Sequence, residues 1–170
     1  MKKPAVSVVI PSYNHGRYVD ACIGAFLGQT FQDFELIIID DASTDDNVDR
    51  IRSHKDERIK LITRAKNCGV AMGMCDGFRL AKADIVAFFA TDDLPAPGYL
   101  AAAIGVMAQN PSADVAYFPS RHIDEEGQAT GDVSSLPFGV TRMEILRRSF
   151  LGGNQLTSPG MVILRDAALG

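Results

Sequence analysis

Two pairs of neighbouring aspartates and one tyrosine-containing segment are the residues of this sequence best suited to bind a ligand. Asp40-Asp41 and Asp92-Asp93 each come at or just after the end of a short apolar run, and Ser12-Tyr13-Asn14 follows a third. A single aspartate pair would as readily mark a turn at a strand end. In open α/β sheets, however, ligands bind outside the carboxyl ends of the strands. Three such segments therefore predict one binding site at one edge of a sheet.

The chemistry of that site follows from its charge. Four carboxylates at one edge repel one another, and a divalent cation such as Mg²⁺ or Mn²⁺ relieves the repulsion. A cation held by one or two carboxylates keeps coordination positions that substrate phosphates commonly take. Tyr13 offers a ring to stack on a base, although a packing role suits it equally. Asp41 offers an acceptor for a base N–H such as the imide of uracil.

Strands and helices that alternate along the chain would position these residues. Continuous apolar runs predict strands that are covered on both faces, and the apolar residues between them repeat with helical spacing. We therefore predict a three-layer, Rossmann-like α/β fold with a mostly parallel central sheet. Residues 1–170 would form a single domain. The apolar runs that predict strands are 6–10, 36–39, 59–62, 85–89 and 115–118.

Shorter signals predict where individual elements begin or turn. Ser43, with an aspartate three residues later, resembles a helix start, and Pro97 suits the first turn of a later helix. Residues 124–127 (Asp-Glu-Glu-Gly) resemble the turn of an exposed hairpin. Thr141, with a glutamate three residues later, resembles a capping box that opens a last helix.

Composition narrows the classes of function. The chain has 170 residues, 46% of them hydrophobic and 22% charged, and a net charge of −4, so we expect no nucleic-acid partner. Its cysteines, Cys22, Cys68 and Cys75, form no CxxC pair and fit a reducing compartment. No run of about 18 apolar residues predicts a membrane segment. The sequence is therefore interpreted as cytoplasmic, with a place at the cytoplasmic face of a membrane left open.

Other polar residues have simpler interpretations. Asp45 and Asp46 suit the first turn of a helix, where acids interact well with the helix dipole. The three histidines lack metal-ligand spacing. We expect His54 in a solvated loop and His15 and His122 at the surface.

Three segments of the sequence together resemble a known family. VSVVIPSYN (6–14), QTFQDFELIIIDDASTDD (29–46) and ADIVAFFATDDL (83–94) resemble glycosyltransferase family 2 in order and spacing, in particular the spore-coat polysaccharide type, which shares the TDD triplet. The resemblance implies a GT-A fold and an enzyme that transfers a sugar, with inversion, from a nucleoside-diphosphate sugar such as a UDP-sugar to an acceptor hydroxyl. It implies a Mn²⁺ or Mg²⁺ cofactor and a role in polysaccharide, cell-surface or glycoconjugate synthesis. The acceptor, whether glycan, lipid-linked or protein, is left open.

The same resemblance implies roles for individual residues. Pro11, Tyr13 and Asp41 would line the nucleoside site. Asp92 would lie near the ribose or the diphosphate, and Asp93 would coordinate the metal.

Two positions depart from the family pattern. Ala90 stands where many members have an aspartate, which reduces an acidic triplet to a pair. Met74 stands where many members have an arginine. If that arginine contacts the diphosphate, its role here is vacant or falls to Arg64 or Arg79.

No catalytic base is assigned from the sequence. The family usually places its base after a segment resembling residues 159–165, and Gly170 follows that segment closely. We therefore expect a domain that is incomplete at the C-terminus, and a chain that binds the donor but transfers sugar poorly. None of the late acids matches the family's base by position: Asp124, Glu125, Glu126, Asp132, Glu144 and Asp166.

Two other classes of protein bind ligands at a comparable sheet edge. A sugar-phosphate nucleotidyltransferase usually has a glycine-rich first loop that ends in a basic residue, which residues 11–14 do not resemble. A receiver-like magnesium-binding module has its acid pair after the first strand and a lysine after the last. Here the pair follows the second strand, and residues 117–120 contain no lysine. GxGxxG and GxxxxGK[ST] motifs are also absent, so we expect neither a dinucleotide site nor a P-loop.

Overall fold

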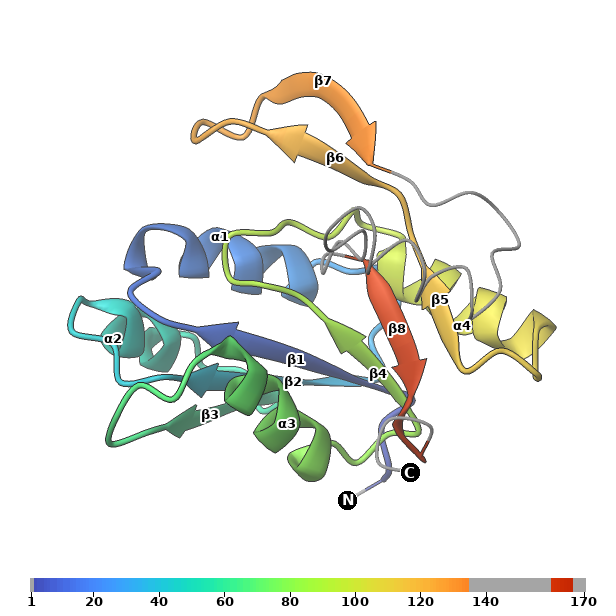
Figure 1. Ribbon diagram of the computed structural model, residues 1–170, viewed down its shortest axis with the longest axis horizontal. Coiled ribbons are helices and arrows are strands. Elements are labelled where there is room, and N and C mark those ends of the chain that lie inside the picture. Colours follow the sequence, from blue (N-terminus) through green and yellow to red (C-terminus); the bar gives the residue numbers. More distant parts are fainter. Residues whose placement is uncertain (1, 135–159, 167–170) are drawn as a thin grey trace, which may run out of the picture.

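A six-stranded, mostly parallel sheet forms the centre of the molecule. The computed structural model describes residues 2–134 and 160–166 (Figure 1). Four neighbouring strands run parallel, and β8 is antiparallel to both of its neighbours, β4 and β5. The mostly parallel sheet expected from the sequence is thus confirmed. In spatial order the strands are β3 (Ile59–Thr63), β2 (Phe34–Asp40), β1 (Val6–Ser12), β4 (Ile85–Phe88), β8 (Met161–Leu164) and β5 (Val115–Tyr117).

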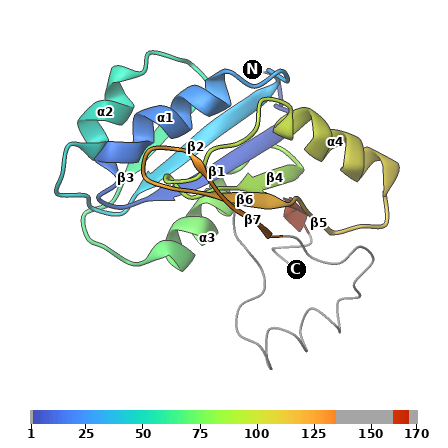
Figure 2. The same ribbon diagram turned by 90° about the horizontal axis from the view of Figure 1, so that it is seen from above.

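Helices cover both faces of this sheet and complete three layers (Figure 2). Successive side chains of a strand point to opposite faces, so β1 sends Val8 toward one helical layer and Val9 toward the other. Val8 shares a core cluster with Phe26 and Leu100, whereas Val9 shares one with Phe78. The first layer is formed by α1 (Gly16–Leu27), α2 (Asn47–Ser53) and α4 (Tyr99–Gln109), and the second by α3 (Val70–Leu80).

Helix α3 lies unusually close to β1. A Cβ added at Gly77 would lie 2.1 Å from Cγ1 of Val9, and one added at Gly73 would lie 3.0 Å from Cβ of Pro11. Both glycines face the sheet because they are four residues apart on one helix. The missing side chains therefore bring α3 against the end of β1, where the candidate site begins.

A two-stranded hairpin, β6 (Ser120–Ile123) and β7 (Ala129–Ser134), extends beyond the main sheet above α1 (Figure 1). Its turn spans the predicted residues 124–127, and Gly127 adopts a φ of +80° that favours glycine. Arg17 Nη1 of α1 lies 2.7 Å from Glu125 Oε2 at the turn. The hairpin prediction is confirmed, and the ion pair ties the hairpin to α1.

The helices α2 and α4 begin a few residues later than the sequence predicts. Helix α2 begins at Asn47 rather than near Ser43, because Ala42 has a φ of +64° and the segment after it belongs to a loop. Helix α4 begins at Tyr99, so Pro97 precedes the helix, and its carbonyl accepts a hydrogen bond from another loop. The helix predicted from Thr141 lies outside the described residues. Among those described, no helix has the length and apolar character needed to cross a membrane.

Candidate active site at the carboxyl edge of the sheet

The three polar segments predicted from the sequence meet at the carboxyl ends of β1, β2 and β4. Ser12 and Asp40 are partners in the parallel register of β1 and β2. The amide of Asp41 donates to the carbonyl of Ser12 at 2.8 Å, and Thr91 Oγ1 donates to the carbonyl of Pro11 at 3.2 Å. The expected convergence is confirmed by these contacts.

The loops after β1 and β2 are held together by a turn residue. Asn14 has a φ of +53°, a left-handed conformation that asparagine tolerates. Its amide donates to Ser43 Oγ at 2.9 Å, and its side-chain oxygen accepts from the Thr44 amide at 2.8 Å. Asn14 thereby fixes the loop that follows Tyr13 against the loop that follows Asp41.

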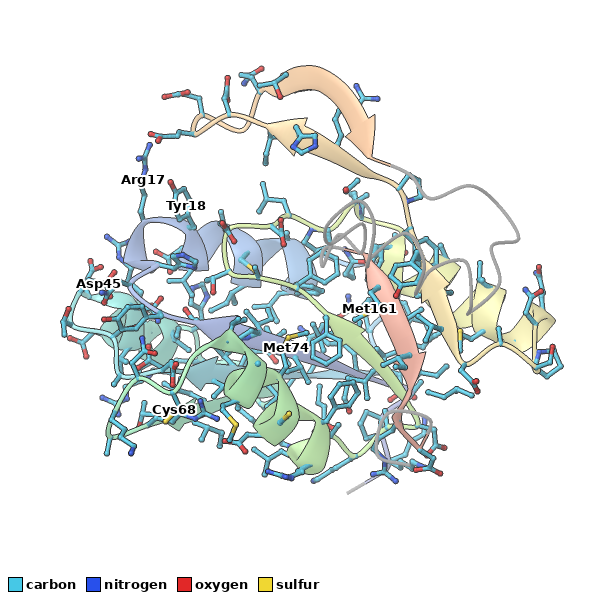
Figure 3. The ribbon with its side chains drawn as sticks, viewed as in Figure 1. Arg17, Tyr18, Asp45, Cys68, Met74 and Met161 are labelled. Atoms are coloured by element: carbon cyan, nitrogen blue, oxygen red, sulfur yellow. The ribbon has the colours of Figure 1, made fainter. Side chains whose placement is uncertain are left out.

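Asp45 links the beginnings of two helices (Figure 3). Its carboxylate accepts from the amide of Gly16 at 2.9 Å and from the amide of Asn47 at 3.1 Å, so it serves α1 as well as α2. Asp46 precedes the first residue of α2 and pairs with Arg50 at 2.7 Å. The expected first-turn position is wrong for both residues, because α2 begins at Asn47 and the acid in its first turn is Asp49; Asp45 and Asp46 precede the helix.

Asp40 is committed to the interior. It is 1% exposed, and its oxygens accept from Asn47 Nδ2 at 2.7 Å and from the Ser43 amide at 3.0 Å. Asn47 Nδ2 also lies 2.9 Å from Ser12 Oγ, so β1, β2 and α2 share one buried polar network. Buried polar groups require such partners, and Asp40 therefore holds the loop in place rather than facing a ligand.

Asp41 is also surrounded by donors. It is 4% exposed and accepts from Arg64 Nη1 at 2.9 Å, the Cys68 amide at 3.0 Å and the Gly69 amide at 2.7 Å. Burial raises the pKa of this carboxyl, but Arg64 and the two amides outweigh it and leave the pKa below its usual value. Asp41 is therefore an ionised acceptor of fixed orientation. Figure 3 marks Cys68 in the turn that supplies the amides.

The other nucleoside residues expected from the sequence, Pro11 and Tyr13, flank Ser12, whose carbonyl accepts from the Asp41 amide. Pro11 packs against Gly73 of α3, and the Tyr13 side chain is 43% exposed at the end of β1, where a ligand can reach its ring. Met74 of α3 packs against the core cluster between α3 and the sheet (Figure 3). The position that many family members fill with arginine is thus a packing position here.

Asp92 and Asp93 have a different environment. Asp92 is exposed, and Asp93 is partly buried and accepts from the amide of Ala90 at 3.2 Å. Burial raises the pKa of Asp93 to about 6; the Ala90 amide opposes this shift, and the charge of Asp92 adds to it. Within the described part of the chain, neither carboxylate pairs with a lysine or arginine.

The expectation that all four carboxylates repel one another is therefore wrong for Asp40 and Asp41, which have protein donors of their own. Only Asp92 and Asp93 retain uncompensated charge. Across residues 2–134 and 160–166, no three histidine, cysteine, aspartate or glutamate side chains are grouped so that they could hold a metal ion.

A pocket of about 360 Å³ opens beside Asp92, between α1, the loop after β4 and the β6–β7 hairpin. Arg17 and Tyr18 point from α1 toward the hairpin (Figure 3), and Leu94 and Ile123 supply apolar surface. Asp92 is the one predicted site residue in its wall. The acidic hairpin turn was visible in the sequence, but its position over α1 depends on contacts between distant residues.

The histidines contribute little to this site. His54 lies in the loop after α2, as expected, but it is only partly solvated: its Nε2 lies 2.8 Å from Asp20 Oδ1 and joins the end of α2 to α1. His15 is partly buried, and its ring lies edge-on to the Tyr18 ring, with 6.0 Å between the ring centroids. His122 is exposed, as expected.

Curated proteins resemble this chain in sequence. The chain is 36% identical over 112 residues to an uncharacterized glycosyltransferase of Haemophilus influenzae, covering 65% of this chain and 45% of that protein. It is 32% identical over 132 residues to chondroitin synthase of Escherichia coli, covering 73% and 18% respectively. The chain thus spans less than half the length of these relatives.

Solved structures show the same fold. TarS residues 1–349 of S. aureus in complex with UDP match with a TM-score of 0.60 and 24% identity, over 65% of this chain and 33% of that one. The mannosyltransferase PcManGT of Pyrobaculum calidifontis, solved with GDP-Man and Mn²⁺, matches with a TM-score of 0.61 and 26% identity, over 68% and 35%. The model of the family described as Glycosyl transferase family 2 matches residues 7–169. The chain belongs to glycosyl transferase family 2.

Proposed function

We propose that this chain carries the donor-binding site of an enzyme that transfers a sugar, with inversion, from a nucleoside-diphosphate sugar to an acceptor hydroxyl. One observation carries the proposal. A buried, ionised acceptor, Asp41, and an uncompensated carboxylate pair, Asp92 and Asp93, lie at one edge of the sheet. A base with an N–H donor complements the first, and a diphosphate bridged by a cation complements the second. A nucleoside diphosphate combines the two.

The relatives support the same reading. The named structural neighbours were solved with UDP and with GDP-Man and Mn²⁺, and one sequence relative is a chondroitin synthase. We therefore assign the chain to polysaccharide, cell-surface or glycoconjugate synthesis. Residues 1–170 are taken as one domain in the cytoplasm or at the cytoplasmic face of a membrane. The three free cysteines fit a reducing compartment.

The carboxylates after β4 fit a divalent metal. Mg²⁺ and Mn²⁺ accept one or two carboxylates together with substrate phosphates, so Asp93 would hold the ion and Asp92 would lie near the ribose or diphosphate. When bound, the cation would stabilise the negative charge of the departing diphosphate as a Lewis acid. Among the described residues, the two arginines that the sequence left open for the diphosphate, Arg64 and Arg79, are both paired with carboxylates.

The other residues have separable roles. Tyr13 would stack on the base, Pro11 would border it, and Asp41 would accept its N–H. The pocket beside Asp92 is the candidate place for the sugar and its acceptor. A carboxylate base would deprotonate the acceptor hydroxyl, but none is assigned. Asp124 accepts from the amides of Glu126 and Gln128, and thereby shapes the hairpin turn.

Calorimetry tests the proposal directly. UDP, GDP and dTDP are titrated into the protein with Mn²⁺ and again with excess chelator. We expect binding with Mn²⁺ and much weaker binding in chelator. Equal affinity in both would contradict the metal-bridged site, and the absence of binding for all three nucleotides in Mn²⁺ would contradict the donor site itself. A thermal-shift series gives an independent readout, because a ligand at about a hundredfold excess over its Kd stabilises the fold by about 2.7 kcal/mol.

A further inference from the structure

Arg64 is held on every side by the protein. It follows the last residue of β3, and its side chain is 12% exposed. Nη1 donates to Asp41 Oδ1 at 2.9 Å, while Nη2 donates to the Met72 carbonyl at 2.7 Å and to the carboxylate of Asp76. Its backbone amide donates to the carbonyl of Asp40 at 2.9 Å. Such a guanidinium has a fixed position relative to β2 and α3.

This environment removes one role that the sequence left open for Arg64. Arg64 is paired with two carboxylates, Asp41 and Asp76, so its positive charge is already compensated and offers a diphosphate little attraction. Arg79 also pairs with Asp76, and its side chain is 68% exposed. Neither arginine replaces the one that Met74 displaces, and Arg64 must act through its partner.

That partner has limited room for a ligand. A carboxylate has about four lone-pair positions. Arg64 donates to Oδ1 of Asp41 and the Gly69 amide to Oδ2, while the single Cys68 N–H is shared between both oxygens at 3.0 Å. Three donors therefore serve two oxygens with about four lone pairs, which leaves acceptor capacity for one incoming donor.

We propose that Arg64 is a positioning residue for base recognition: it fixes the Asp41 carboxylate so that its remaining acceptor position takes an N–H donor of the base. The inference rests on the proposed donor site. Bases that carry an imide or ring N–H, such as uracil, satisfy this acceptor. Cytosine is nearly the same shape but presents an acceptor at N3 and leaves two acceptors facing one another. UDP should therefore bind more tightly than CDP.

Loss of Arg64 removes both the fixed orientation and the neighbouring positive charge. The carboxylate can then rotate, and it can also take a proton and donate to cytosine. Arg64 consequently affects the ratio of affinities for two nucleotides, whereas a purely structural residue would weaken both alike.

The experiment measures Kd for UDP and CDP in Mn²⁺ by calorimetry, with melting curves to confirm folding. The variants are Arg64→Gln, Asp41→Asn and their double combination, with Arg79→Gln as the matched control because it also removes a partner of Asp76. Arg64→Gln should lower the UDP preference at least about fivefold, which is within the range for a hydrogen bond to a charged group. Arg79→Gln should keep the wild-type preference. The double variant should show the same preference as Asp41→Asn, because Arg64 acts through Asp41.

The possible results distinguish a failure of the Arg64 proposal from a failure of the proposed donor site. A wild-type protein that binds neither nucleotide overturns the proposed function, and the inference with it. A wild-type protein that prefers UDP, together with an Arg64→Gln protein of unchanged preference, overturns the inference alone. Equal wild-type affinity for UDP and CDP does the same.

Arg64→Lys covers the case in which Arg64→Gln does not fold. Lysine keeps the charge without the planar fork of donors, so its UDP preference should fall between those of the wild type and Asp41→Asn. A lysine variant with the full wild-type preference would show that charge alone suffices and would refute a positioning role.

Discussion

The aspartates after β2 and those after β4 stand at the same edge of one sheet, yet their surroundings are opposite. Asp40 and Asp41 are buried, and each accepts at least two hydrogen bonds from the protein. Asp92 is exposed, and Asp93 is partly buried beside it with a raised pKa. A pair of aspartates that closes an apolar strand therefore has two uses. One pair builds and orients the loops, and the other leaves charge for a ligand.

The chain that follows each strand explains the difference. After β2, helix α2 supplies Asn47 and the end of β3 supplies Arg64, and both reach back to the acids. After β4, the sequence contains no lysine or arginine between Lys82 and Arg121. The neighbouring sequence supplies no cation for Asp92 and Asp93, which suits a site whose countercharge is a divalent metal ion that binds together with the diphosphate.

The largest effect should come from Asp40→Ala. It leaves Asn47 Nδ2 and the Ser43 amide without their acceptor, and each buried donor left unpaired costs about 1–3 kcal/mol. We expect the free energy of unfolding to fall by about 2–4 kcal/mol in urea denaturation. Asp92→Ala is the matched control at the other pair, and its exposed side chain should change stability by less than about 0.5 kcal/mol. An equal loss of unfolding free energy in the two variants would show that the two aspartate pairs do not differ in structural role.

The next effect concerns Asp93→Asn, which should act on the ligand rather than on the fold. The loss of a charged metal ligand should weaken Mn²⁺-dependent binding of UDP about tenfold to a hundredfold, as expected for about 1.5–3 kcal/mol. The melting temperature without metal should stay the same or rise, because a buried charge beside Asp92 has been removed. Calorimetry and melting curves on one preparation check both. A large drop in stability without metal would show that Asp93, like Asp40, mainly holds its loop in place.

A smaller effect is expected for Asp41, whose contribution to stability should depend on pH. The folded protein lowers the pKa of Asp41, so its contribution to stability is present above the unfolded value of about 3.9 and is lost as pH falls through the folded value. Asp41→Asn should therefore be less stable than the wild type at pH 7, and the gap should narrow below about pH 4. Urea denaturation from pH 7 to pH 3 measures the gap. A gap that widens in acid would show that Asp41 is not held ionised.

The smallest effect should come from Arg17→Gln, which breaks the ion pair between α1 and the hairpin above the pocket. Both side chains are largely exposed, and such pairs contribute little to stability. Urea denaturation should show only a small change, and adding salt should reduce it further because exposed charges are screened. A loss as large as that of Asp40→Ala would mean that the hairpin is held as firmly as the loops after β2.

Much of the frame follows from local sequence patterns. Continuous apolar runs predict strands covered on both faces, and parallel strands must bring their carboxyl ends to one edge, so the meeting of Tyr13, Asp41 and Asp92 was predictable. The hairpin turn at 124–127 was also predictable, because glycine and acidic residues identify tight turns locally.

The tertiary structure decided which carboxylates of the site are paired within the protein and which are free to bind a ligand. Arg64 reaches Asp41 across 23 positions, and Arg17 reaches Glu125 across 108, so no local pattern contains either pair. The loop before α2 bonds to Ser12, the last residue of β1, and to Asn14, two residues beyond it, and α2 begins only at Asn47. The sequence by itself determined which groups gather at the edge of the sheet. Packing between distant segments decided which carboxylates are neutralised and which stay available, because a buried charge depends on the neighbours that the fold brings to it.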